Sequence, residues 1–189
     1  MDLAEKYERG ACTVEIFYDP EPESPREWCN LGTMVHWHRR SEIGDENIRH
    51  LADEYALEDL PDYFKRERGA TVVLPVYLYE HSGQTVNTTG FSCPWDSGQV
   101  GFIFDTPKGR EDCGTPPELI EECLRGEVAD FDRYLRGEVY GYVVERDGEH
   151  VDSCWGFHGD IDYVKSEANA VADHETKNVE SLGAYEAAH

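Results

Sequence analysis

The chain has 189 residues, of which 40 are acidic and 17 basic, and its formal net charge is −23 at pH 7. Hydrophobic residues make up 39% of the sequence and aromatic residues 12%, so the composition is that of a folded globular protein and not of an acidic disordered tail. These numbers exclude a collagen, a coiled coil, a basic nucleic-acid-binding module and a protein that spans a membrane.

Two strands are expected in the first 40 residues. Residues 12–18 form the first, because hydrophobic and β-branched residues dominate them. A loop follows, in which Pro20, Pro22 and Pro25 remove hydrogen-bond donors. Residues 33–38 alternate between polar and apolar side chains and predict the second strand.

Helical spacing of hydrophobic residues begins after residue 45, and Pro61 suits the first turn of a second short helix. Residues 71–80 are apolar or aromatic on both faces, which predicts a central strand with a bulge or a missing hydrogen bond at Pro75. A long loop over 81–98 precedes a strand at 99–104, whose Val100, Phe102 and Phe104 would share one face.

The last third of the chain contains both helix and strand signals. Thr115–Glu118 matches a capping box, so a helix is expected to begin there and to stop at Gly126. Residues 138–146 and 149–158 predict a hairpin, because Asp147 and Gly148 between them form a favoured turn pair. A C-terminal helix is expected from Ile161.

These elements predict an α+β fold. We expect a single domain over residues 1–175 and a frayed polar tail over 176–189. The sheet would be mainly antiparallel, with about five or six strands and helices packed on one side.

The surplus of carboxylates has two explanations. Proteins that work in molar salt tolerate it, because the Debye length there falls to about 3 Å and surface repulsion is screened. In the alternative, carboxylates imitate phosphates and occupy a DNA-binding partner, which requires them to gather on one face. The acidic residues extend from Asp2 to Glu186, which favours salt adaptation. Direct binding to duplex DNA is not expected, because this charge repels phosphate.

The cysteines do not form a metal or redox motif. No C-x-x-C pair occurs, and the N-terminal residues lack the apolar stretch of a secretory signal. We therefore expect free thiols in a cytoplasmic protein with no membrane partner. The six are Cys12, Cys29, Cys93, Cys113, Cys123 and Cys154.

Four strings resemble an uncharacterised family of small accessory proteins carried by tailed viruses and mobile elements of bacteria and archaea. They are residues 24–40, 74–104, 134–144 and 152–157, and the most specific string is CPWDSGQVGFIF at 93–104. The resemblance implies a small accessory protein made in an infected or element-bearing cell, here in a halophilic-type version. It implies no activity and no catalytic residues.

His36 and His38 are the first candidate site. On a strand both imidazoles would project from one face about 7 Å apart, a spacing that can serve a divalent metal. The alternative is two polar histidines on a solvent-facing strand, and no other cofactor is predicted. Further metal ligands would come from His81, Asp96, Cys154 or His158.

The loop over 81–98 is the second candidate. It combines His81, Cys93, Trp95 and Asp96 with hydroxyl groups and glycines, a set that could bind a small polar ligand. In the alternative the loop packs its aromatic residues onto the core.

The strand over 150–158 is the third candidate. Asp152, Cys154 and His158 would share one face and suit a nucleophilic cysteine with a histidine base. Cys154 and His158 would nevertheless lie about 13 Å apart on an extended strand, unless Gly156 bends the chain. In the alternative, Cys154 is a buried thiol under a helix.

No motif of a known catalytic class occurs in the sequence. We therefore expect a non-enzymatic accessory protein that binds a protein partner of the host or virus, such as a defence or nucleic-acid enzyme. One alternative is a small metal- or thiol-dependent hydrolase, and another is a virion structural or decoration protein. Five aromatic residues are expected to be exposed and to anchor a partner: Trp28, Trp37, Tyr77, Tyr79 and Trp95. The hydrolase would use His36, His38, Cys93, Asp96 and His158.

Overall fold

The computed structural model describes residues 1–40 and 43–187, and it confirms the α+β class with 36% helix and 34% strand. The strands form two sheets, where the sequence analysis expected one. Among the described residues, no helix is both long enough and apolar enough to cross a membrane.

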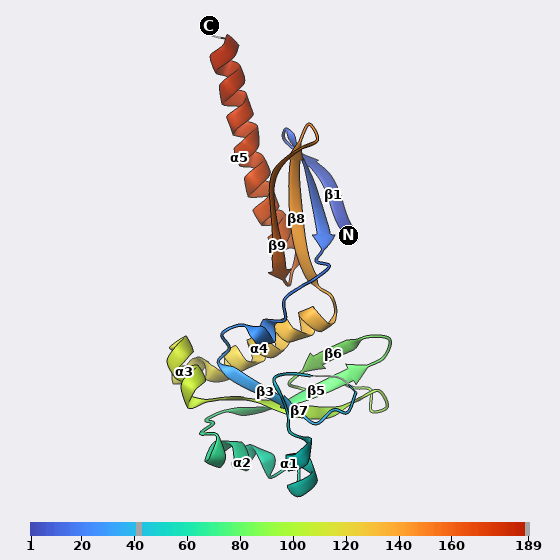
Figure 1. The fold of residues 1–189 in the computed structure, drawn as a ribbon, viewed down its shortest axis with the longest axis vertical. Helices are drawn as coiled ribbons and strands as arrows, with labels where there is room; N and C mark the ends of the chain where they lie inside the picture. Colours follow the sequence, from blue (N-terminus) through green and yellow to red (C-terminus); the bar gives the residue numbers. More distant parts are fainter. Residues whose placement is uncertain (41–42, 188–189) are drawn as a thin grey trace. The chain divides into compact units, whose positions relative to one another are not determined.

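The chain forms two compact units, each with its own sheet (Figure 1). Unit 1 combines Met1–Glu23 with the chain from Gly137 onward, and unit 2 is Ser24–Arg136. Unit 2 is inserted between two strands that pair directly in unit 1, β2 (Cys12–Tyr18) and β8 (Val139–Arg146). The first boundary falls in the loop that contains Pro20, Pro22 and Pro25, but the sequence analysis did not interpret this loop as a boundary between units.

Unit 1 is a four-stranded antiparallel sheet with one helix along one face (Figure 1). The strand order is β1-β2-β8-β9, where β1 is Leu3–Arg9 and β9 is Glu149–His158. Helix α5 (Ile161–Ala187) buries Val164 and Ala168 against the sheet. The predicted hairpin between β8 and β9 is present, with Asp147 and Gly148 at φ 54° and 80°. Those angles suit the turn pair that the sequence predicts.

Helix α5 continues as far as Ala187, through much of the stretch expected to fray. Contacts with the turn between β1 and β2 and with β8 hold its middle. The Thr176 hydroxyl accepts a hydrogen bond from the Ala11 amide at 3.0 Å and donates one to the Ala172 carbonyl at 2.8 Å. Glu175 forms an ion pair with Arg146 of β8.

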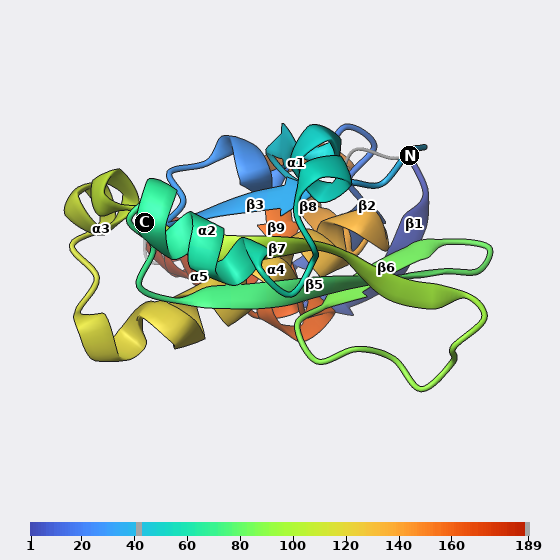
Figure 2. The same cartoon turned by 90° about the horizontal axis from the view of Figure 1, so that it is seen from below.

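Unit 2 contains a five-stranded sheet of order β4-β3-β7-β5-β6, antiparallel except for the pair of β3 and β4. Helices cover both faces, where the sequence analysis placed them on one side (Figures 1 and 2). Helix α4 packs on one face, and α1 and α2 pack on the other. The strands are β3 (Gly32–His36), β4 (Glu46–Asn47), β5 (Val73–Glu80), β6 (Gln84–Asn87) and β7 (Ser97–Asp105). The helices are η1 (Pro25–Glu27), α1 (Arg49–Glu54), α2 (Leu60–Glu67), α3 (Pro107–Cys113), η2 (Pro117–Leu119) and α4 (Ile120–Leu135).

Two expectations about α4 were wrong. Thr115 does not cap it, because the 3-10 turn η2 intervenes and α4 begins at Ile120 without a side-chain cap. The helix also continues through Gly126, because Leu124, Val128 and Phe131 extend one buried face across that glycine. This face outweighs the low helix propensity of one glycine, which costs about 1 kcal/mol.

A β-bulge in β7 changes which side chains face the core. The register shifts where Val76 opposes Gly101 and Tyr77 opposes Gln99, so Val100 is the extra residue. Val100 therefore packs with the α4 side, while Phe102 packs with the α2 side, and the prediction of one shared face was wrong. A Cβ at Gly101 would lie 1.9 Å from the Val35 carbonyl oxygen, so the close approach of β3 requires glycine there.

Arg26 of η1 joins three separate segments of unit 2. Its side chain is 6% exposed, and its guanidinium donates to both carboxylate oxygens of Asp45 at 3.0 and 2.7 Å. It also donates to Glu127 of α4 at 3.0 Å and to the Gly32 carbonyl at 2.7 Å. Burial acts to lower the pKa of Arg26, but the hydrogen bonds and charges of Asp45 and Glu127 raise it above its usual value.

Asp105 at the end of β7 is fully buried and accepts four hydrogen bonds. The donors are the Thr71 amide at 2.9 Å, the Thr71 hydroxyl at 2.8 Å, the Val72 amide at 2.6 Å and the guanidinium of Arg110. Burial acts to raise the pKa of Asp105, but these hydrogen bonds outweigh burial and hold the pKa below its usual value. The carboxylate thereby fixes the start of β5 to the end of β7.

Candidate functional site

Three chain segments meet at one end of the unit 2 sheet. Strands β3 and β5 both run antiparallel to β7, so the residues that follow β3 and β5 lie beside the residues that precede β7. We call this surface the loop rim and define it as residues 37–40, 80–81 and 93–98. It contains five residues predicted as site candidates, His38, His81, Cys93, Trp95 and Asp96.

Two imidazole–carboxylate pairs lie in the loop rim. The His38 Nε2 is 3.9 Å from a carboxylate oxygen of Glu80, and the His81 Nδ1 is 3.5 Å from a carboxylate oxygen of Asp96. The Glu80 amide donates to the Asp96 carbonyl at 2.9 Å, which ties the two pairs together. Glu80 was not predicted from the sequence, because a lone acid at a strand end has no pattern of its own.

Two adjoining cavities open between these side chains. One has a volume of about 280 Å³ and is lined by residues that include His38, Glu80, Trp95 and Asp96. The other has a volume of about 440 Å³, shares His38 and Glu80, and extends to Arg39 and Arg40.

Trp95 is the most unusual side chain of the loop rim. It is 92% exposed, although tryptophan is highly buried on average and its large apolar surface is unfavourable in water. The loop that carries it extends from the end of the sheet between β6 and β7 (Figure 2). Part of the predicted loop is a strand, β6, which pairs with β5. The loop therefore does not use Trp95 to cover the core, while Phe91 packs against the ring of Tyr79 at 5.7 Å.

The thiol of Cys93 does not belong to a catalytic triad of the usual order. Its Sγ donates to a carboxylate oxygen of Asp96 at 3.8 Å, so the carboxylate lies between the thiol and the imidazole of His81. A cysteine hydrolase places the imidazole next to the thiol, where it acts as the base. The order of thiol, carboxylate and imidazole here therefore differs from that of a cysteine hydrolase.

The two histidines of the predicted metal site, His36 and His38, lie in different surroundings. Among the residues that the structure describes, no group of three or more His, Cys, Asp or Glu side chains could hold a metal ion. His36 is 3% exposed and sits on β3 beside the buried Val35, so the expectation of a solvent-facing pair of histidines was wrong for His36. Strand β3 ends at His36, and His38 lies beyond its regular alternation.

The remaining predicted catalytic residues, Cys154 and His158, belong to β9 of unit 1. Gly156 has a φ of 81°, and the pairing with β8 shifts there, so two residues of β9 oppose one of β8. The bulge brings Phe157 into the cluster under α5, at 5.8 Å from the ring of Tyr142. The prediction that Cys154 and His158 share one face assumed a regular alternation of side chains along β9. The bulge interrupts that alternation.

Three of the five aromatic residues expected to be exposed are only partly exposed. Trp37 packs against the ring of Phe102 at 5.8 Å, and Tyr77 and Tyr79 are half-buried on β5. Trp28 is 43% exposed, but it lies at the opposite end of the sheet from Trp95. The nine-residue strand β7 separates those two ends by roughly 30 Å.

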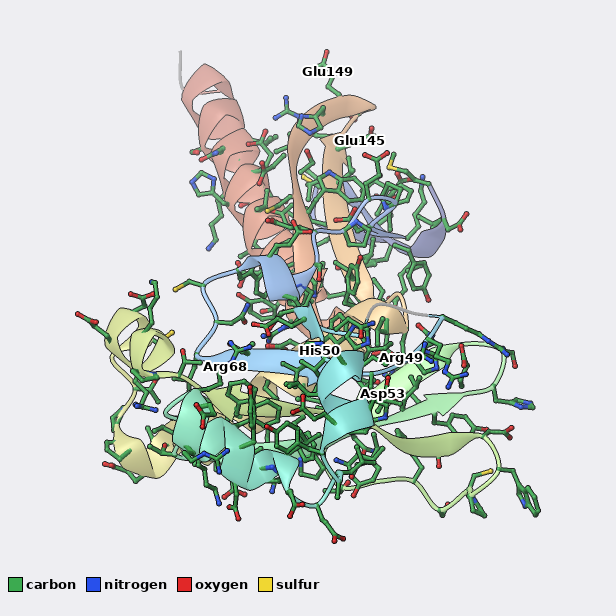
Figure 3. All side chains as sticks on the ribbon, turned by 60° about the horizontal axis from the view of Figure 1, so that its bottom comes forward. Arg49, His50, Asp53, Arg68, Glu145 and Glu149 are labelled. Carbon is green, nitrogen blue, oxygen red and sulfur yellow. The ribbon has the colours of Figure 1, made fainter. Side chains whose placement is uncertain are left out.

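The cluster of basic residues on and just after α2 is neutralised by nearby acids. On α2 and just after it, Lys65, Arg66 and Arg68 pair with Asp62, Glu67 and Glu46 at 3.6, 2.6 and 2.7 Å. Arg68 pairs with a residue of β4, and the side chains of α1 labelled in Figure 3, Arg49, His50 and Asp53, mix both signs of charge. This mixture is typical of a solvated helix surface and not of a phosphate-binding patch.

Comparisons with known proteins identify no relative of the chain. No protein-family model, no curated protein and no solved structure matches it.

Proposed function

We propose that the protein is a non-enzymatic accessory protein that binds a macromolecular partner through the loop rim, with Trp95 as the anchor. The exposure of Trp95 carries this proposal. When a partner buries an exposed tryptophan, the removal of its large apolar surface from water stabilises the complex. Tryptophan is also enriched among the residues that dominate binding energies.

The charges point to the chemistry of the partner. Glu80 and Asp96 lie beside Trp95, and the whole chain has a net charge of −23. This combination suits a protein partner that presents an apolar pocket bordered by basic side chains, as enzymes that handle nucleic acids do. The resemblance to accessory proteins of viruses and mobile elements supports a host defence or nucleic-acid enzyme as that partner.

Replacing Trp95 with alanine is expected to weaken binding by about 2 kcal/mol or more, which is roughly 30-fold in the dissociation constant. The change should leave the melting temperature within about 1 °C, because the side chain is 92% exposed and its loss removes little packing. Quantitative affinity purification at high salt, from cells that carry the gene, compares the variant with the wild-type protein.

Trp28→Ala is the matched control, because Trp28 is an exposed tryptophan at the other end of the same sheet. A partner retained by wild type and Trp28→Ala but lost by Trp95→Ala supports the proposal. Retention of every reproducible partner by Trp95→Ala contradicts it.

The acidic surface suits a halophilic host, because acidic side chains outnumber basic ones in both units and are not confined to one of them. Unit 1 contains 19 acidic and 5 basic side chains, and unit 2 contains 21 acidic and 12 basic ones. Lowering the salt concentration from about 3 M to 0.05 M lengthens the Debye length from below 3 Å to more than 10 Å and restores repulsion. We expect loss of the far-UV circular dichroism signal during this change, and an unchanged spectrum contradicts salt adaptation.

A further inference from the structure

Two exposed cysteines of unit 2 lie in contact. Cys29 follows η1, and Cys113 is the last residue of α3. The thiol of Cys113 is hydrogen-bonded to the sulfur of Cys29, although 84 positions of the sequence separate the two residues. Neither residue belongs to the loop rim.

The backbone holds this contact in place. Gly109 lies one helical turn before Cys113 on the same face of α3, and it is pressed against the backbone of Leu31, two residues after Cys29. A Cβ at Gly109 would lie 2.2 Å from the Leu31 carbonyl oxygen, so only glycine allows α3 to approach so closely. The hydroxyl of Thr106 caps the helix by accepting from the Gly109 amide at 3.0 Å.

We propose that Cys29 and Cys113 form a redox-sensitive dithiol, which hydrogen peroxide converts into an intramolecular disulfide. The peroxide is the oxidant. A Cys29 thiolate attacks one peroxide oxygen and becomes a sulfenic acid, and the other oxygen leaves as hydroxide, which takes up the proton of the thiol to give water. The Cys113 sulfur then attacks the sulfenic sulfur, and a second water leaves. Two thiols and one peroxide thus give one disulfide and two waters.

The surroundings assign different roles to the two sulfurs. The ammonium of Lys108 lies close enough to Cys29 for the two groups to interact electrostatically, and we assign the attack on peroxide to Cys29. Burial, the charge of Cys29 and the hydrogen bond to Cys29 raise the pKa of the Cys113 thiol, in that order of size. Cys113 therefore remains protonated and suits the resolving role.

The disulfide would join the N-terminal segment of unit 2 to the end of α3. A cross-link that closes a loop of this length restricts the unfolded chain strongly and stabilises the folded one. We expect the oxidised protein to melt about 10 °C higher than the reduced protein.

The test treats the reduced full-length protein with hydrogen peroxide and blocks the remaining thiols with N-ethylmaleimide. Cleavage after glutamate separates Cys113 from Cys123, and mass spectrometry of the unreduced peptides identifies the pairing. The expected product is a Cys29–Cys113 peptide that dithiothreitol releases, together with the higher melting temperature. In Cys113→Ser, Cys29 should accumulate as sulfenic and sulfinic acid with no rise in melting temperature.

Cys154→Ser is the matched control, because Cys154 is an exposed thiol of unit 1. It should behave as wild type in both readouts. Three results would overturn the proposal. They are peroxide products without the Cys29–Cys113 peptide, disulfides only between molecules, or an unchanged melting temperature despite the cross-link.

Discussion

Replacing Arg26 with alanine is expected to destabilise the protein by about 3–5 kcal/mol. The reason is that Arg26 is 6% exposed, and its removal leaves the carboxylates of Asp45 and Glu127 without their cation. Asp45 also accepts a hydrogen bond from the amide of Met34 in the middle of β3, and Glu127 accepts one from the amide of Leu31 just before β3. The defect therefore reaches the sheet and one of the helices that cover it. Chemical denaturation followed by circular dichroism measures the loss.

Arg133→Ala is the matched control, because Arg133 pairs with Asp130 at 2.7 Å in the same unit while both side chains are 42% exposed. Surface pairs contribute about 0–1 kcal/mol, and high salt screens them further, so this variant should change stability by less than about 0.5 kcal/mol. If Arg26→Ala does not fold, a milder double-mutant cycle of Arg26→Lys and Glu127→Gln measures the coupling. A coupling energy near zero, or equal effects of Arg26→Ala and Arg133→Ala, contradicts this role for Arg26.

Replacing Asp105 with asparagine is expected to lower stability at neutral pH by about 3 kcal/mol, because a buried amide cannot replace a carboxylate that accepts from Arg110 and two backbone amides. The pKa of Asp105 is lower in the folded chain than in the unfolded chain, where it is about 3.9. Its contribution to stability is therefore complete above that unfolded value and is lost as pH falls through the lower folded value.

The difference in melting temperature between wild type and Asp105→Asn should thus be constant from about pH 7 to 5 and should shrink at more acidic pH. Asp112→Asn serves as a control, because Asp112 is a partly exposed acid that pairs with Lys108 on α3. A difference between wild type and Asp105→Asn that grows as the pH falls would show that Asp105 does not stabilise the fold as a carboxylate.

Local features of the fold could be predicted from the sequence. The hairpin at Asp147 and Gly148, the short helix that begins beside Pro61 and the apolar strand β5 all depend on residues that are neighbours in the chain. Strand β1 was missed because its side chains are mostly polar, and it is an edge strand with only β2 beside it. The bulge at Val100 was missed because an extra residue has no signal of its own in an alternating pattern, whereas Gly156 had been named as a residue that could bend its strand.

Long-range features could not be predicted. The division into two sheets depends on the pairing of β2 with β8 across the whole of unit 2, and no local pattern encodes it. The partners of Arg26 lie 19 and 101 residues away in the sequence. For the candidate site, the residue types could be predicted from the sequence, but their arrangement in space could not. His81, Cys93, Trp95 and Asp96 were selected by residue type, but their meeting with Glu80 depends on strand register.

A photoreactive amino acid placed at position 95 tests the central claim most directly, because it records what touches the loop rim. With benzoylphenylalanine at position 95, we expect ultraviolet light to yield one dominant cross-linked protein in cells that carry the gene. The same residue at position 28, at the other end of the sheet, should not yield that protein. Absence of any specific product from position 95, or the same product from both positions, would contradict binding through the loop rim.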